Sequence, residues 1–124
     1  MDFLIVFVGA GLGGACRHGV NLAAARVFGT GFPAGTLIVN VLGSIAMGVL
    51  AGWLAHRAGP GQGARLFLAT GFLGGFTTFS AFSLDTALLA ERGAVGMAAA
   101  YVVLSVAGAV GGLFAGLALV RSLG

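Results

Sequence analysis

Four long apolar stretches follow one another along the chain, and the short segments between them carry nearly all of the charge. Residues 27–55, 66–84 and 93–120 contain no charged residue and no histidine, and residues 3–16 are also free of both. A helix that crosses the hydrocarbon core of a bilayer, about 30 Å thick, needs roughly 20 apolar residues. The pattern therefore predicts an all-α membrane protein with four transmembrane helices, over about residues 3–25, 35–56, 65–90 and 94–121.

The first helix is the least regular of the four, because Arg17 and His18 fall inside it. Its short uncharged stretch also has the length of a signal peptide, but Asp2 stands where a basic segment would precede one. Residues 9–14 match the dinucleotide-binding pattern G-x-G-x-x-G, yet no acid for the ribose lies between Asp2 and Asp85. We interpret the segment as a transmembrane helix whose glycines serve packing.

The connections, near residues 26–34, 57–62 and 90–93, are too short to hold a second domain, so residues 1–124 form one transmembrane domain. Four crossings place both termini on the same side, together with Arg57, Arg65 and Arg121, whereas Arg26 and Arg92 lie on the other. Orientation follows the arginine and lysine bias of short loops, and three against two is a weak bias. Either another feature orients the chain, or it inserts both ways and pairs as an antiparallel dimer.

The composition excludes several classes of function. The chain is 59% hydrophobic and 7% charged, whereas ordinary soluble domains carry about 25% charged residues. Six arginines face three acids, but they are scattered rather than clustered, so no nucleic-acid-binding surface is expected. The single cysteine cannot form an intramolecular disulfide. A soluble enzyme and a disordered segment are both excluded.

Glycine is the most informative packing residue, with 24 copies. In membranes, small residues four apart let helices approach closely. Such pairs occur at Gly9/Gly13, Gly48/Gly52 and Gly71/Gly75, and a three-step ladder at Gly108, Gly112 and Gly116. The ladder predicts that the last helix packs tightly against a neighbour.

Polar residues within the apolar stretches are few, and such residues normally face the bundle interior or a water path. Thr36, Asn40 and Ser44 fall on one stripe of the second helix, and Tyr101 and Ser105 on one stripe of the fourth. Hydrogen bonding between helices is the simplest role for such groups. We favour that interpretation for Ser44.

The third helix carries a denser cluster, in which two glycines precede two β-branched threonines at residues 74–78. This pattern predicts a mid-membrane interruption, which is tolerated only where the freed backbone groups line a cavity or bind an ion. Freed carbonyls suit Na⁺, and a new helix start suits an anion. Phe79 and Phe82, three residues apart, share a face and can offer positive ring edges to an anion, although core packing is the commoner use of such a pair. With no acid inside helices one, two or four, the pattern favours a passive anion path.

At these residues the chain resembles the Fluc family of fluoride channels, also called CrcB proteins. The matching segments are GACRH at residues 14–18, GTLIVNVLG at 35–43 and GFLGGFTTFSAFS at 71–83. The resemblance covers essentially the whole chain. It implies a multi-pass protein of the bacterial inner membrane that passes F⁻ down its gradient, lowers cytoplasmic fluoride and confers fluoride resistance. It also implies an antiparallel, dual-topology homodimer.

The resemblance further implies roles for particular residues. Phe79 and Phe82 would contact the ion along the pore, and Asn40 would donate its side-chain amide to it. The candidates for a polar track along the same pore are Thr36, Ser80, Tyr101 and Ser105. A structural Na⁺ at the dimer interface would be held by the backbone carbonyls of Gly74 and Thr77. Arg17 would lie near an aqueous vestibule and draw anions in.

Three positions depart from the family pattern. Ala109 stands where a second serine is often found, which puts the far end of the polar track in doubt. Asp85 stands where glutamate is common, and the shorter acid reaches less far. His18 replaces a common aromatic residue, a change expected to be neutral.

Two other classes of function compete with the channel. A small multidrug carrier has similar length and dual topology, but such carriers have a glutamate in helix one, which is absent here. A structural assembly subunit would use the polar stripes only for packing, so replacing Asn40 by alanine would impair assembly rather than ion flux. An enzyme is not expected, because the sequence offers no nucleophile–base set and no cluster of metal ligands.

Overall fold

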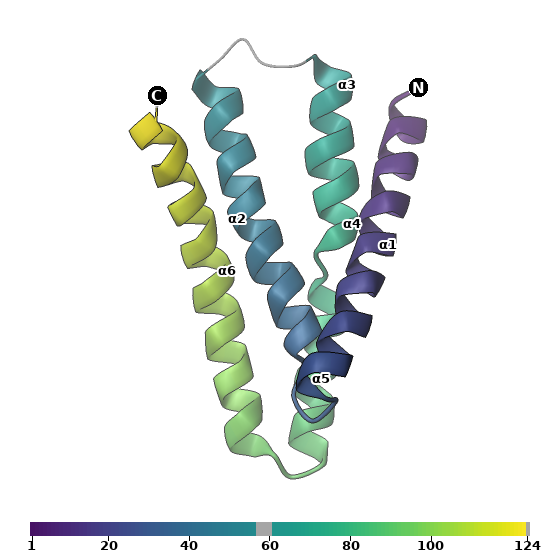
Figure 1. Ribbon diagram of the computed structural model, residues 1–124, viewed down its shortest axis with the longest axis vertical. Helices are drawn as coiled ribbons and strands as arrows, with labels where there is room; N and C mark the ends of the chain where they lie inside the picture. Colours follow the sequence, from purple (N-terminus) through teal and green to yellow (C-terminus); the bar gives the residue numbers. More distant parts are fainter. Residues whose placement is uncertain (57–60, 124) are drawn as a thin grey trace.

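The computed structural model describes residues 1–56 and 61–123, which fold into helices joined by short connections (Figure 1). Among these residues, four segments are long and apolar enough to cross a membrane: Asp2–Phe28, Ala34–Ala55, Gln62–Glu91 and Val95–Leu123. The predicted all-α architecture with four membrane-spanning helices is thereby confirmed. Residues 57–60 of one predicted connection, with Arg57, lie outside the described residues.

The first, second and fourth spans are single helices: α1 (Asp2–Phe28), α2 (Ala34–His56) and α6 (Val95–Leu123). The strand-like run at residues 3–8 and the glycine motif after it are helical, as the packing interpretation requires. Helix α1 runs further than predicted because it ends only at Gly29, whose φ of 76° favours glycine. Both ends of the chain lie at the same end of the bundle (Figure 1), as predicted.

The third span consists of several pieces. A short helix α3 (Gln62–Arg65) continues into the π-helix η1 (Leu66–Leu73) and then into one turn, α4 (Gly74–Phe76). Thr77 (φ −90°, ψ 157°) and Thr78 (φ −154°, ψ 121°) are extended, and we call them the extended pair. Helix α5 (Phe79–Glu91) then begins, with the Thr78 hydroxyl accepting a hydrogen bond from the N–H of Ala81 as its N-cap.

The turn after α5 is a Schellman motif centred on Gly93, whose φ is 87°. The N–H of Ala94 donates to the Leu89 carbonyl and the N–H of Gly93 to the Ala90 carbonyl, at 2.9 and 3.1 Å. This turn reverses the chain into α6.

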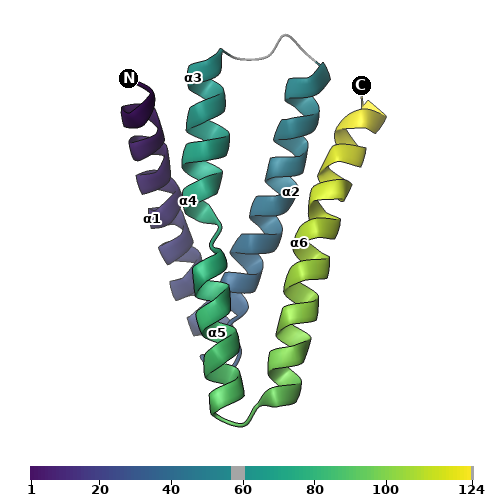
Figure 2. The ribbon, with the colours of Figure 1, turned by 180° about the vertical axis from the view of Figure 1, so that it is seen from behind.

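The four spans pack as two pairs, α1 with η1 and α4, and α2 with α6 (Figures 1 and 2). At the end opposite the termini, α5 packs against α6 and so joins the pairs. Towards the termini, α2 and α3 diverge in both views. The molecule thus has a wide end and a narrow end.

Glycine defines the contact surface of each pair. A Cβ on Gly9 would lie 2.7 Å from the Phe67 carbonyl oxygen of η1, and one on Gly112 would lie 2.8 Å from the Ile45 side chain of α2. The predicted glycine pairs at 9/13, 48/52 and 71/75 all lie at helix contacts, and the ladder at 108/112/116 packs against α2. The prediction of tight packing by the last helix is confirmed.

A Gly116→Ala substitution should destabilise the α2–α6 pair, because its Cβ would meet the Ile45 carbonyl oxygen and lie 2.8 Å from the Val49 nitrogen. Overpacking of this kind costs about 1–3 kcal/mol. Gly111→Ala is the matched control on the same helix, since nothing lies within 4 Å of its Cβ. Free energies of unfolding in detergent micelles would test the pair, and equal stability of the two variants would contradict the proposed packing.

Candidate functional site

The extended pair is held by a side chain from another helix. Asn40 of α2 accepts a hydrogen bond from the Thr78 N–H at its Oδ1 (2.8 Å) and donates from its Nδ2 to the Thr78 carbonyl (3.0 Å). One hydrogen of Nδ2 remains for another acceptor. The predicted polar stripe of α2 is thus turned inward, with Asn40 engaged on the backbone of the third span.

A second helix reaches the same region from the other side. The half-buried Arg17 of α1 donates from Nε to the carbonyl of Gly75 in α4 (3.1 Å). Carbonyl ends of helices attract positive charge, and a hydrogen bond to a charged donor is stronger than a neutral one. Arg17 therefore stabilises the end of α4 directly before the extended pair.

Several carbonyls beside this contact are free, and those of Gly74 and Thr77 are among them. Across residues 1–56 and 61–123, no hydrogen bond is formed to the carbonyl oxygen of Gly74 or of Thr77. Gly74 is exposed and Thr77 is half-buried. Freed backbone carbonyls are the oxygen donors with which broken membrane helices coordinate Na⁺. The donor set at these two residues fits such an ion.

An aromatic row continues from the extended pair towards α6. The rings of Phe79 and Phe82 have centroids 5.5 Å apart, and Phe82 lies 5.3 Å from Tyr101. Phe32, which follows α1, meets Tyr101 edge-on at 5.5 Å. Phe79 is 78% exposed whereas Tyr101 is fully buried. The row therefore runs from the surface of the chain to its interior.

The buried end of the row carries the acid of α5. The Tyr101 hydroxyl donates to the Asp85 carboxylate at 3.1 Å. The side chain of Asp85 is therefore long enough for this contact. Thr36 is buried, 7% exposed, and Ser80 is exposed with its hydroxyl 3.3 Å from that of Thr78.

A cavity of about 440 Å³ lies between α2, the third span and α6. Its polar and aromatic lining comprises Asn40, Ser44, Thr77, Thr78, Phe79, Phe82 and Ser105. Ser105 is 5% exposed, and its hydroxyl has no hydrogen-bond partner among the described residues. The rest of the lining is apolar and includes Ala109.

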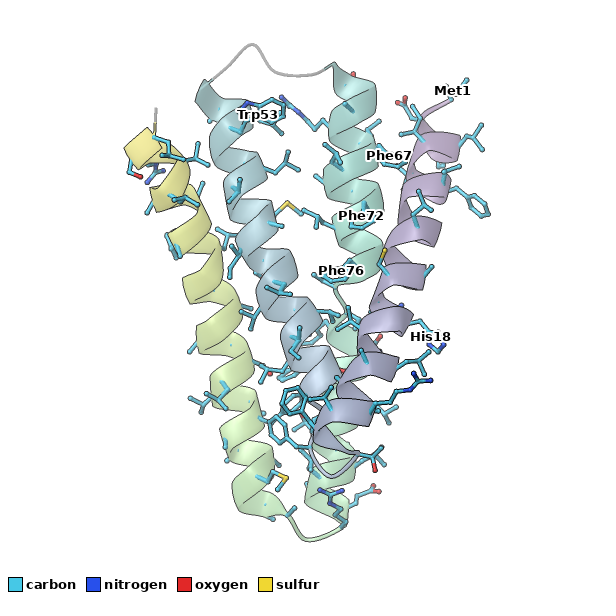
Figure 3. All side chains as sticks on the ribbon, in the orientation of Figure 1. Met1, His18, Trp53, Phe67, Phe72 and Phe76 are labelled. Carbon is cyan, nitrogen blue, oxygen red and sulfur yellow. The ribbon has the colours of Figure 1, made fainter. Side chains whose placement is uncertain are left out.

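The structure gathers only part of the predicted site around this cavity. Five predicted residues line it: Asn40, Thr77, Phe79, Phe82 and Ser105. The other predicted residues do not: Thr36, Ser80, Tyr101, Arg17 and Gly74. Ser44, which we expected to bond between helices, lines it as well. His18 is exposed and points away from the other helices (Figure 3). Phe32 was missed, because it lies in a predicted connection and its contact with Tyr101 is purely tertiary.

The sequence was compared with known protein families and with curated proteins. Residues 4–117 match the family model described as CrcB-like protein, Camphor Resistance (CrcB). The chain belongs to the CrcB family. The chain is 63% identical to "Fluoride-specific ion channel FluC 2" of Nitrobacter hamburgensis, over 99% of both proteins. It is 62% identical to "Fluoride-specific ion channel FluC" of Methylobacterium nodulans, over 100% of this chain and 99% of the relative.

A further relative, from Rhodopseudomonas palustris and also named "Fluoride-specific ion channel FluC", is 58% identical over 99% of both proteins. The names of these relatives describe an ion channel and not an enzyme. With four membrane-spanning segments among its described residues, this CrcB chain is a multi-pass membrane protein.

Arg17→Ala should destabilise the CrcB fold by about 1.5–3 kcal/mol, the usual contribution of a hydrogen bond to a charged group. The reason is that the Gly75 carbonyl would lose its donor at the end of α4. Arg26→Ala is the control, since Arg26 lies exposed in the last turn of the same helix. Thermal unfolding of both variants in micelles measures the difference, and similar melting temperatures would refute this role.

Proposed function

We propose that this protein is a passive, fluoride-selective ion channel that exports F⁻ across the bacterial inner membrane, lowers cytoplasmic fluoride and confers fluoride resistance. Membership of the CrcB family and relatives named fluoride-specific ion channels support this assignment. The names of those relatives support the specificity for fluoride, and the residues around the cavity support the passage of an anion.

The observation that carries the proposal is the unpartnered hydroxyl of Ser105 in the cavity lining. A buried polar group without a hydrogen bond costs about 1–3 kcal/mol of stability. A serine that only packed against its neighbours would therefore destabilise the protein at this position. An anion in the cavity would accept from this hydroxyl and from the remaining Nδ2 hydrogen of Asn40. Phe79 and Phe82 line the same space and carry positive ring edges.

The neutral character of the lining supports an anion that moves rather than stays. The cavity is lined by hydroxyls, one amide, aromatic rings and apolar side chains, and none of the described residues in its lining is charged. F⁻ is small and strongly hydrated, so a path must replace water by several short hydrogen bonds. Tyr101 lies beside Phe82, with the two rings tilted at 43°, and Thr36 is buried on α2. These two residues would continue the polar track away from the cavity. Ser80, which is exposed, would lie at the outer end of this polar track.

The functional unit in this proposal is an antiparallel homodimer with dual topology in the lipid bilayer. Phe79 lines the cavity but is 78% exposed, so the chain itself leaves this side of the path uncovered. The weak arginine bias between the two sides agrees with insertion in both directions. The extended pair lies near the middle of the third span, Gln62–Glu91, which supports an interruption at mid-membrane depth.

A structural Na⁺ belongs to the same proposal. The free carbonyls of Gly74 and Thr77 fit a hard cation, and the exposure of Gly74 is compatible with a site at the dimer interface. The ion would supply positive charge between the helix breaks of the two copies in the dimer, each of which offers free carbonyl oxygens. Arg17, beside the end of α4, would add positive potential near the vestibule that F⁻ enters.

Passive efflux from liposomes tests the proposed function. Vesicles that contain the purified protein and either KF or KCl are treated with valinomycin, so that K⁺ can follow the anion. We expect rapid loss of F⁻ and retention of Cl⁻. Loss of both ions would refute selectivity, and retention of both by folded dimers would refute the channel and favour the assembly subunit.

Ser105→Ala should separate conduction from stability. The hydroxyl makes no bond within the described residues, so its removal should leave the unfolding free energy unchanged or raise it, while fluoride efflux falls. Ser122→Ala is the control on the same helix, because that hydroxyl donates to the Leu119 carbonyl and is outside the cavity. Efflux rates at equal amounts of dimer give the result, and unchanged efflux of Ser105→Ala would remove this residue from the path.

A further inference from the structure

The two hydrogen bonds of Asn40 act on two successive peptide planes. The Thr78 N–H shares its plane with the Thr77 carbonyl, and the Thr78 carbonyl shares its plane with the Phe79 N–H. Asn40 holds the first at 2.8 Å and the second at 3.0 Å. A single carboxamide therefore fixes the backbone on both sides of Thr78.

The direction of the Thr77 carbonyl follows from this contact. The described residues contain no cis peptide bond, and in a trans peptide the C=O and N–H point in opposite directions. Because the Thr78 N–H points to Asn40, the Thr77 carbonyl points away from the Asn40 side chain. By the same rule, the Phe79 N–H at the start of α5 also points away from it.

The same contacts explain why the Gly74 and Thr77 carbonyls are free. In a continuous α-helix the Gly74 carbonyl would accept from the Thr78 N–H, and the Thr77 carbonyl from the Ala81 N–H. Both donors are bonded elsewhere: the Thr78 N–H to Asn40, and the Ala81 N–H to the Thr78 hydroxyl at 3.2 Å. Two side-chain oxygens thus divert the two donors that would otherwise cover these carbonyls.

We infer that Asn40 and the Thr78 hydroxyl are positioning groups that expose the Gly74 and Thr77 carbonyls for cation binding, by diverting the N–H groups of Thr78 and Ala81. The inference rests on the proposed function, because it explains why the carbonyls of the proposed Na⁺ site are exposed. It assigns Asn40 a role through the backbone, separate from any contact with the permeating anion. Without Asn40, the Thr78 N–H would return to the Gly74 carbonyl and close the helix.

Carbon-13 chemical shifts of labelled threonine test the backbone step directly, because Cα and Cβ shifts separate extended from helical residues. In the native dimer we expect extended shifts for Thr77 and Thr78. In Asn40→Leu we expect Thr78 to move towards helical values, while Thr36, Thr70 and Thr86, which lie within helices, remain unchanged. An unmoved Thr78 in Asn40→Leu would overturn the inference.

Sodium-dependent stability tests the second step, with NaCl compared against the chloride of N-methyl-D-glucamine. The native dimer should melt at a higher temperature in Na⁺, and Asn40→Leu and Thr78→Val should lose that difference. Thr86→Val should keep it, because the Thr86 hydroxyl only donates to the Phe82 carbonyl within its own helix. Retention of the sodium effect in both site variants, or its absence from the native dimer, would overturn the inference.

Neither readout depends on ion flux. A protein that shows both effects but passes no fluoride would contradict the proposed function and keep the cation site. A protein that passes fluoride but shows neither effect would contradict the role given to Asn40 and Thr78 and the proposed Na⁺ site, and would keep the channel.

Discussion

The need to satisfy every backbone hydrogen-bonding group in hydrocarbon is the constraint on which the rest of this structure depends. Lipid offers no partner to a free N–H or C=O, yet the third span leaves the helix at Thr77 and Thr78. Asn40 from α2 takes both groups of Thr78, and Arg17 from α1 takes the carbonyl of Gly75. Three spans therefore meet at the extended pair, and the cavity opens beside it.

The glycines make this meeting possible. Carbonyl oxygens of Phe67 and Phe72 in η1 face Gly9 and Gly13 of α1, where any Cβ would collide with them. These two carbonyls are five residues apart along η1, whereas the two glycines are four residues apart along α1. The wider turn of the π-helix accommodates this difference. Close approach of α1 to η1 then brings Arg17 within reach of Gly75. A larger residue at these glycines would withdraw that donor from the end of α4.

Much of the fold was predictable because lipid imposes simple rules on sequence. Runs without charge located the four spans, and the inward stripe of α2 followed from the positions of Thr36, Asn40 and Ser44. The partners of these groups were not predictable, since periodicity identifies a face and not the atom opposite it. The bond from Arg17 to Gly75, the contact of Phe32 with Tyr101 and the π-helix η1 all depend on tertiary placement. For the same reason, the two hydrogen bonds between the Asn40 amide and the backbone of Thr78 could not be predicted from the sequence.

The central claim is that F⁻ crosses this protein passively and in preference to Cl⁻. The most direct test is the zero-current potential of a planar bilayer that contains the protein, with fluoride salt on one side and chloride salt on the other. The account predicts a large potential whose sign is set by fluoride diffusion and which persists when K⁺ is replaced by an impermeant cation, with Na⁺ kept equal on both sides. A potential near zero, or one with the sign of chloride diffusion, would contradict it.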